Sequence, residues 1–140
     1  MGKGAILIIE DNKDIRVPIS IMLGNEGFDV FEAEDCQTAF DCLAEEQPDL
    51  ILTDLLMPEM TGLEFIRQIR RTSGLLDIPI IAMSAYDTSY LAAAVLAGAN
   101  AALHKPEDMD RLVETIKEVL RYDGHTKEKL QYAGNGGRQD

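Results

Sequence analysis

Cysteine is scarce in this chain, and neither of its two cysteines suggests a disulfide bond or a zinc site. Cys36 and Cys42 are six residues apart in one predicted helix, so they point in different directions and cannot form a bridge within it. Neither belongs to a C-x-x-C motif or has a histidine nearby, as zinc ligands usually do. The sequence therefore predicts no disulfide framework and disfavours a zinc site.

Basic residues and long apolar runs are lacking as well. The 140 residues include 13 lysines and arginines against 25 aspartates and glutamates, a formal net charge of −12. That charge would repel a nucleic-acid backbone or an anionic membrane surface. No apolar stretch is long enough for a membrane span or a signal-peptide core. We therefore expect a cytoplasmic chain with one globular domain that binds neither DNA nor membranes directly.

Short apolar runs alternate along the chain with stretches of helical period. The runs are Ala5 to Ile9, Val30 to Ala33, Leu50 to Thr53, Ile80 to Met83 and Ala101 to His104. The helical stretches are centred on Ile15 to Leu23, Ala39 to Leu43, Leu63 to Ile69, Thr88 to Ala97 and Leu112 to Leu120. This alternation predicts an α/β fold with a parallel sheet covered by helices on both faces. The second run is half polar, which is typical of an edge strand.

Four of these runs end on polar residues that carry reactive groups. Glu10 and Asp11 follow the first run, Asp54 the third, Ser84 the fourth and Lys105 the fifth. Parallel strands present their carboxyl ends at one edge of the sheet, so these side chains are expected to meet. Like charges a few Å apart raise one another's pKa unless a cation lies between them. The pattern therefore indicates a hard divalent cation, and chemistry on an anionic group that Ser84 and Lys105 contact.

Two enzyme-like or cofactor-binding alternatives lack the residues that they need. A flavodoxin or a dinucleotide-binding protein has a glycine- or hydroxyl-rich loop after its first strand, where this chain has Glu10, Asp11 and Asn12. A haloacid-dehalogenase-type phosphatase has a second acid two residues after its nucleophile, where this chain has Leu56. We therefore expect no enzyme that turns over a separate substrate.

The signatures at these strand ends resemble the receiver domain of bacterial two-component response regulators. They are Glu10-Asp11, residues 54–62 (DLLMPEMTG), Ser84-Ala85 and Lys105-Pro106, in the order that the family has. The resemblance covers about residues 4–122 and implies a flavodoxin-like, doubly wound sheet of five parallel strands in the order 2-1-3-4-5, with five helices. Residues 123–140 lose apolar periodicity and are expected to form a mobile or partly helical tail.

The resemblance also implies a role for each acid. Asp54 would be the phosphoacceptor, taking a phosphoryl group from a phosphohistidine of a sensor histidine kinase or a phosphotransfer protein. Asp11, Asp54 and the backbone carbonyl of Leu56 would bind Mg²⁺ directly, and Glu10 would hold it mainly through water. Mg²⁺ prefers oxygen ligands and keeps several waters, which agrees with this assignment. Apart from its own phosphorylation and dephosphorylation at Asp54, the chain would catalyse nothing.

Further residues receive roles from the same resemblance. Lys105 and Ser84 would contact phosphoryl oxygens and act as the switch, and the bond between Lys105 and Pro106 would be cis. Leu56 and Tyr86 flank the approach of the hydrolytic water in this family, so they would control dephosphorylation. Both are bulky and neither can orient a water, which predicts a long-lived phosphorylated state.

The chain departs from the family pattern at two positions near the fifth strand. Ala102 stands where many receivers carry an aromatic residue that reports phosphorylation, and Glu107 where phenylalanine is common. The expected output is a conformational change at the face of the fourth helix, fifth strand and fifth helix. Either Tyr86 or Tyr90 supplies the replacement ring, or both tyrosines are merely surface or packing residues. A homodimer through that face stays open, as does a binding module that no longer depends on phosphorylation. The downstream protein target, and whether the receiver stands alone or belongs to a longer protein, stay open too.

Overall fold

The structure is a computed structural model that describes residues 3–57, 60–85 and 88–122. Its strands are β1 (Ala5–Ile9), β2 (Asp29–Ala33), β3 (Leu50–Asp54), β4 (Ile80–Ser84) and β5 (Ala101–His104). Its helices are α1 (Lys13–Asn25), α2 (Cys36–Glu45), α3 (Gly62–Ile69), α4 (Thr88–Ala97), a short 3-10 turn η1 (Met109–Arg111) and α5 (Leu112–Tyr122). The elements confirm the predicted alternation of strands and helices. The expected tail, residues 123–140, lies outside the described residues.

All five strands are parallel and lie in the order β2-β1-β3-β4-β5, which confirms the flavodoxin-like prediction. The chain leaves β1 toward β2 and later returns to the other side of β1 as β3, so the strand order reverses between β1 and β3. In open α/β sheets, ligands bind outside the carboxyl ends of the strands at such a reversal. The register pairs Ile9 with Thr53, Asp54 with Met83 and Ser84 with His104, so these strands end at almost the same level.

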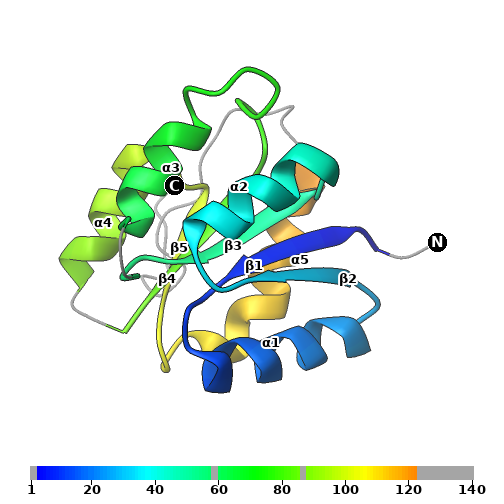
Figure 1. Ribbon diagram of the computed structural model, residues 1–140. Helices are drawn as coiled ribbons and strands as arrows, with labels where there is room; N and C mark the ends of the chain where they lie inside the picture. Colours follow the sequence, from blue (N-terminus) through cyan, green and yellow to red (C-terminus); the bar gives the residue numbers. More distant parts are fainter. Residues whose placement is uncertain (1–2, 58–59, 86–87, 123–140) are drawn as a thin grey trace.

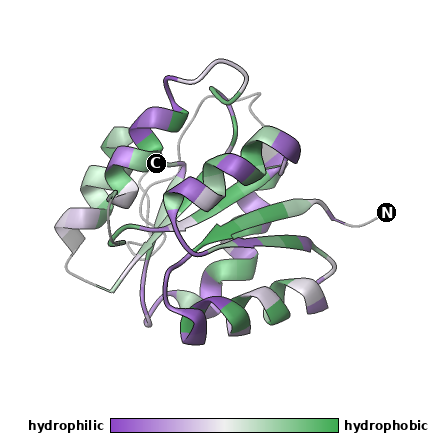
Figure 2. Cartoon of the chain, in the orientation of Figure 1, coloured by the Kyte–Doolittle hydropathy of each residue, from purple (hydrophilic) through white to green (hydrophobic). Residues whose placement is uncertain are grey.

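The helices cover the two faces of the sheet in separate groups. Helices α1 and α5 lie on one face, and α2, α3 and α4 lie on the other (Figure 1). Successive strand residues alternate between the two cores: Ile6 and Ile8 face α1 and α5, whereas Leu7 and Ile9 face the other three helices. Figure 2 shows apolar strands enclosed by helices whose outer surfaces are more polar. The sheet is thus a covered platform, and the polar residues lie at the carboxyl ends of its strands.

Local sequence explains where the helices begin. Asn12 caps α1, since its side-chain oxygen accepts the backbone N–H of Asp14 at 2.9 Å. Thr61 caps α3 in the same way through Glu64. In α3, Ile66 and Ile69 are fully buried as predicted, but Leu63 is only partly buried, and Phe65 is fully buried in addition. The reason is that α3 packs against both the sheet and α2, where Phe65 meets the ring of Phe40.

None of the helices in the described ranges is both long enough and apolar enough to cross a membrane.

Candidate functional site

Three carboxylates meet at the carboxyl edge of the sheet, where the strand order reverses. Glu10 and Asp11 follow β1 directly, and Asp54 is the last residue of β3. One ligand oxygen from each lies within 4.8 Å of the other two. Glu10 and Asp54 are buried, with 2% and 7% exposure, whereas Asp11 is exposed. The cluster therefore opens to solvent on the side of Asp11.

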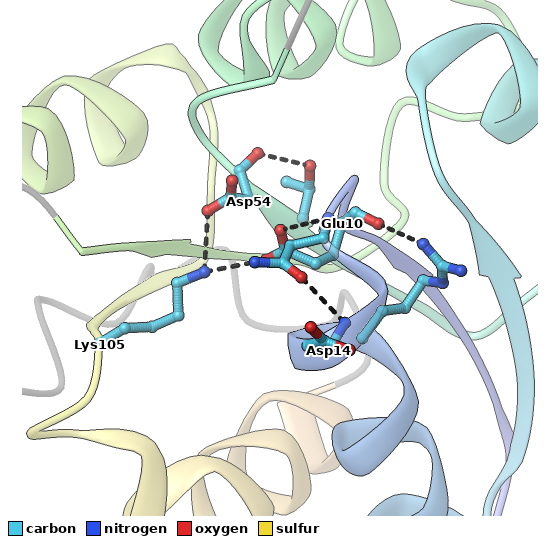
Figure 3. A network of polar contacts seen from close by, with 7 residues as sticks. Glu10, Asp14, Asp54 and Lys105 are labelled. Atoms are coloured by element: carbon cyan, nitrogen blue, oxygen red, sulfur yellow. Dashed lines mark hydrogen bonds and ion pairs between the residues drawn. The ribbon is translucent and has the colours of Figure 1, made fainter.

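Lys105 lies between two of these acids. Its ammonium nitrogen is 2.9 Å from Oε1 of Glu10 and 3.2 Å from Oδ1 of Asp54, and the three side chains converge in Figure 3. Burial by itself would lower the pKa of Lys105, but the hydrogen bond to Glu10 and the charge of Asp54 outweigh it, and the net shift is upward. Lys105 is thus held as a cation at the centre of the site.

Both buried acids have a raised pKa, in spite of their contact with Lys105. For Glu10 the main cause is burial, and the neighbouring charge of Asp54 adds to it. For Asp54 the main cause is also burial, partly offset by Lys105 and by a hydrogen bond from the backbone of Leu55. One lysine therefore does not fully stabilise these ionised carboxylates. A set of clustered carboxylate oxygens that is short of positive charge fits a hard divalent cation such as Mg²⁺.

Ser84 and the Lys105-Pro106 bond lie on the adjoining strands. Ser84 ends β4 and is fully buried, opposite His104 in β5, and its carbonyl accepts the backbone N–H of Lys105 at 2.7 Å. The Lys105-Pro106 peptide bond is cis. The structure therefore places Ser84 and Lys105 at the same sheet edge as the acids, as the sequence pattern predicted.

Of the two positions expected to control dephosphorylation, the structure describes one. Leu56 is partly buried and lies in the loop that follows β3, two residues beyond Asp54. Tyr86 lies outside the described residues.

The two departures from the family pattern are also visible. Ala102 is fully buried and pairs with Ala82, while Glu107 is exposed and its carboxylate lies 2.5 Å from Nδ1 of His104.

Gly62 contributes to the site through its lack of a side chain. Its backbone N–H donates to the carbonyl of Leu55 at 2.8 Å, which brings the start of α3 against the end of β3. A Cβ atom at Gly62 would lie 2.3 Å from the carbonyl oxygen of Asp54 and 2.6 Å from Cα of Leu55. Because these are backbone atoms, only glycine allows this approach beside Asp54.

Two residues that the sequence pattern did not indicate hold the acid-bearing loop in place. In α1, Arg16 donates to the carbonyl of Glu10 through Nη1 and to the carboxylate of Glu32 through Nε, each at 2.8 Å. Nothing in the local pattern marks these residues, since an arginine on an amphipathic helix and a glutamate on an edge strand are both ordinary surface residues.

Comparison with known proteins agrees with this site. The model of the response regulator receiver domain matches residues 6–117. The chain is 36% identical over 117 residues to the phosphate regulon transcriptional regulatory protein PhoB of Escherichia coli, covering 83% of this chain and 51% of PhoB. It is 34% identical to the response regulator MprA of Mycolicibacterium vanbaalenii, covering 83% and 50%. The chain thus spans about half the length of these curated relatives.

Solved structures show the same likeness. The chemotaxis response regulator CheY4 of Vibrio cholerae superposes with a TM-score of 0.75 at 28% identity, covering 82% of this chain and 97% of CheY4. The family model spans most of the chain, the strand order is that of the family's fold, and acids and a lysine occupy the carboxyl edge of the sheet. The chain is therefore a member of the response regulator receiver domain family.

Proposed function

We propose that this receiver accepts a phosphoryl group on Asp54, in the presence of Mg²⁺, from a phosphohistidine of a sensor histidine kinase or a phosphotransfer protein. The observation that supports this most is the position of Asp54. It shares a cluster of three carboxylates within 4.8 Å, and it lies 3.2 Å from the cation of Lys105. A nucleophilic carboxylate beside a fixed positive charge is what phosphoryl transfer to an aspartate requires.

The proposed chemistry uses few protein groups. An oxygen of Asp54 attacks phosphorus, an O–P bond forms, the P–N bond to the donor histidine breaks, and the imidazole leaves with the electron pair. Asp11, Asp54 and the Leu56 carbonyl would hold Mg²⁺, with Glu10 acting through water, and the ion would neutralise charge on the phosphoryl oxygens. Lys105 already lies beside Asp54 and would contact a phosphoryl oxygen there, with the Ser84 hydroxyl donating to another. Beyond this self-modification, no turnover of another substrate is proposed.

Intact-mass measurement tests the proposal. The protein is incubated with acetyl phosphate or phosphoramidate and Mg²⁺, and Asp54→Asn serves as the matched control because it keeps the size of the side chain. We expect one phosphoryl adduct in the wild type, and none in the variant or under EDTA. An adduct that persists in Asp54→Asn, or that forms equally well without Mg²⁺, would contradict the proposal.

The output is proposed to pass through α4. Ser84 ends β4, and α4 begins four residues later, so movement of Ser84 toward the phosphoryl group would be transmitted to this helix. The body of α4 is rich in alanine, which allows a shift of the helix without large rotamer changes. Position 102, where many receivers carry an aromatic residue that reports phosphorylation, holds a buried alanine instead. Amide shifts on adding beryllofluoride and Mg²⁺ are expected to extend through residues 88–101. Shifts confined to the loops around Asp54 would instead favour a binding module that does not depend on phosphorylation.

The partners follow from the family. A kinase or phosphotransfer protein would deliver the phosphoryl group to Asp54. In the phosphorylated protein, the face of α4, β5 and α5 would dock a protein target or a second copy of the chain. PhoB is named a transcriptional regulatory protein, but the net charge of −12 argues against direct contact between this chain and DNA. We place this activity in the cytoplasm.

A further inference from the structure

Arg16 joins the acid-bearing loop to both α1 and the edge strand β2. Its Nη1 donates to the backbone carbonyl of Glu10 at 2.8 Å, and its Nε donates to Oε1 of Glu32 at 2.8 Å. Its side chain is only 13% exposed. The contact between the guanidinium and the backbone of Glu10 is drawn as a dashed line in Figure 3. This arginine is therefore a partly buried connection, held at two points of its guanidinium.

The carbonyl of Glu10 needs such a donor because the ladder of β1 ends just before it. The register of β1 stops at Ile9, which pairs with Ala33 on one side and Thr53 on the other. The N–H of Glu10 still bonds to the carbonyl of Ala33, but its own carbonyl turns toward α1. Backbone carbonyls that leave a sheet and are buried are satisfied by another donor, which Arg16 supplies.

The same stretch of chain carries two of the three acids of the cluster, Glu10 and Asp11. With its carbonyl held by Arg16 and its N–H held by Ala33, Glu10 is fixed on both sides, and its carboxylate accepts the N–H of Asn12 at 3.1 Å and Lys105 at 2.9 Å. Asp11 follows directly on this fixed peptide. The direction in which the two carboxylates point therefore depends on where Arg16 holds the chain.

We propose that Arg16 is a positioning residue for the divalent-cation site, acting through the Glu10 backbone and held in turn by Glu32. This inference rests on the proposed Mg²⁺ site. Residues that orient metal ligands without touching the metal commonly change affinity when they are replaced. Arg16 would thus favour cation binding although it is itself a cation.

A positioning role and a purely electrostatic role of Arg16 predict opposite changes in Mg²⁺ affinity when Arg16 is replaced. If Arg16 acted only as a nearby positive charge, its removal would reduce repulsion and Mg²⁺ would bind more tightly. If Arg16 positions the loop, its removal lets the acids turn away and Mg²⁺ binds more weakly. The direction of the change therefore decides between the two, independently of its size.

The test is a titration with Mg²⁺ alone, without any phosphodonor, followed by amide resonances at low ionic strength. Arg16→Met is compared with wild type, and Arg67→Met is the matched control. Arg67 lies on α3 in an exposed ion pair 3.6 Å from Glu64, so its removal changes the net charge equally without touching the acid loop. Arg16→Lys keeps the charge but cannot reach both partners with a planar fork. Thermal unfolding in EDTA is recorded for each variant.

We expect Mg²⁺ affinity to fall about tenfold in Arg16→Met and less in Arg16→Lys, and to stay unchanged in Arg67→Met. Tighter or unchanged binding in Arg16→Met would overturn the inference, even if the variant unfolds at a lower temperature. If Arg16→Met does not fold, Arg16→Lys decides: weaker binding supports the inference and wild-type binding overturns it. Failure of the wild type to bind Mg²⁺ at all would instead overturn the proposed function, and this inference with it.

Discussion

Lys105 and Glu10 are 95 positions apart in the sequence, yet the ammonium nitrogen of Lys105 lies 2.9 Å from a carboxylate oxygen of Glu10. Both side chains are largely buried, and Asp54 completes the group at 3.2 Å. Without a metal ion, the positive charge of Lys105 partly offsets the repulsion and the burial cost of these carboxylates. The same residue would have to contact the phosphoryl group after transfer, so its partners before and after transfer differ.

Replacing Lys105 by methionine should separate folding from metal binding. Loss of the cation raises the pKa of Glu10 and Asp54 further and leaves two buried acids without a counter-charge, so the metal-free protein should lose about 3 kcal/mol of stability at neutral pH. Mg²⁺ should bind at least as tightly, because a competing cation has been removed. Urea unfolding with and without Mg²⁺ measures both effects, with Lys117→Met as the control because the ion pair of Lys117 with Glu26 is long, at 3.9 Å. Loss of Mg²⁺ binding in Lys105→Met would show that the lysine has another role.

Asp11→Ala should strongly weaken Mg²⁺ binding and phosphorylation together without harming the fold. Asp11 is the exposed member of the cluster, so its removal leaves the core intact but takes away a proposed direct ligand. We expect affinity for Mg²⁺ to fall by about tenfold or more. Asp14→Ala removes the same charge three residues away, at an exposed position in α1, and should change affinity little. Equal titrations of wild type and Asp11→Ala would make the ligand assignment wrong.

The raised pKa of Asp54 predicts a pH-dependent stability in EDTA. A carboxyl whose pKa is higher in the folded than in the unfolded state costs stability once it ionises, so this cost is present at neutral pH and disappears as pH falls through the folded pKa. Asp54→Asn should therefore unfold at a higher temperature than wild type at pH 7, by about 2 to 5 °C. The difference should shrink on acidification toward the ordinary carboxyl range. If the unfolding temperature of Asp54→Asn instead rose further above that of wild type at low pH, ionisation of Asp54 would stabilise the folded protein.

Gly62→Ala should disturb the site through the backbone. The added Cβ would overlap the carbonyl of Asp54 and Cα of Leu55, so α3 must shift, at a cost of about 2 kcal/mol or more. Since the shift moves the loop that carries Leu56, Mg²⁺ affinity should fall as well. Gly24→Ala in α1 is the control, because nothing lies within 4 Å of a Cβ there, and it should gain up to about 1 kcal/mol. Wild-type affinity in Gly62→Ala would show that the loop absorbs the change.

The lifetime of the phosphorylated state should be long and should depend on Leu56 and Tyr86. Neither side chain can orient an attacking water, so hydrolysis of the aspartyl phosphate is expected to be slow. Combining Leu56→Asn with Tyr86→Glu should speed first-order loss of the adduct in purified protein at constant Mg²⁺. The single variants show which position matters more. Equal rates for wild type and the double variant would refute shielding by these residues.

The sequence alone determined the fold class and the membership of the acid cluster. Apolar runs at Ala5 to Ile9 and Leu50 to Thr53 mark buried strands, because a strand covered on both faces is apolar at nearly every position and these runs are too short for helices. Parallel strands end at one edge of the sheet, so the positions of Glu10, Asp54 and Lys105 at the ends of their runs predict that they lie close together. These inferences depend on local pattern and on a topological rule, both of which are readable without coordinates.

Only the tertiary structure decided which groups contact one another and how strongly they are perturbed. The pairing of Lys105 with both Glu10 and Asp54, the raised pKa of these acids, and the hold of Arg16 on the Glu10 backbone depend on burial and on distances of a few Å between remote segments. The same is true of Gly62, whose need for glycine comes from the carbonyl of Asp54 packed against it. The sequence pattern does not show how deeply a side chain is buried or how closely two distant segments approach each other. Hydrogen-bond energies and desolvation depend on differences of less than about 1 Å and on the packing of single atoms, so only the tertiary structure determines them.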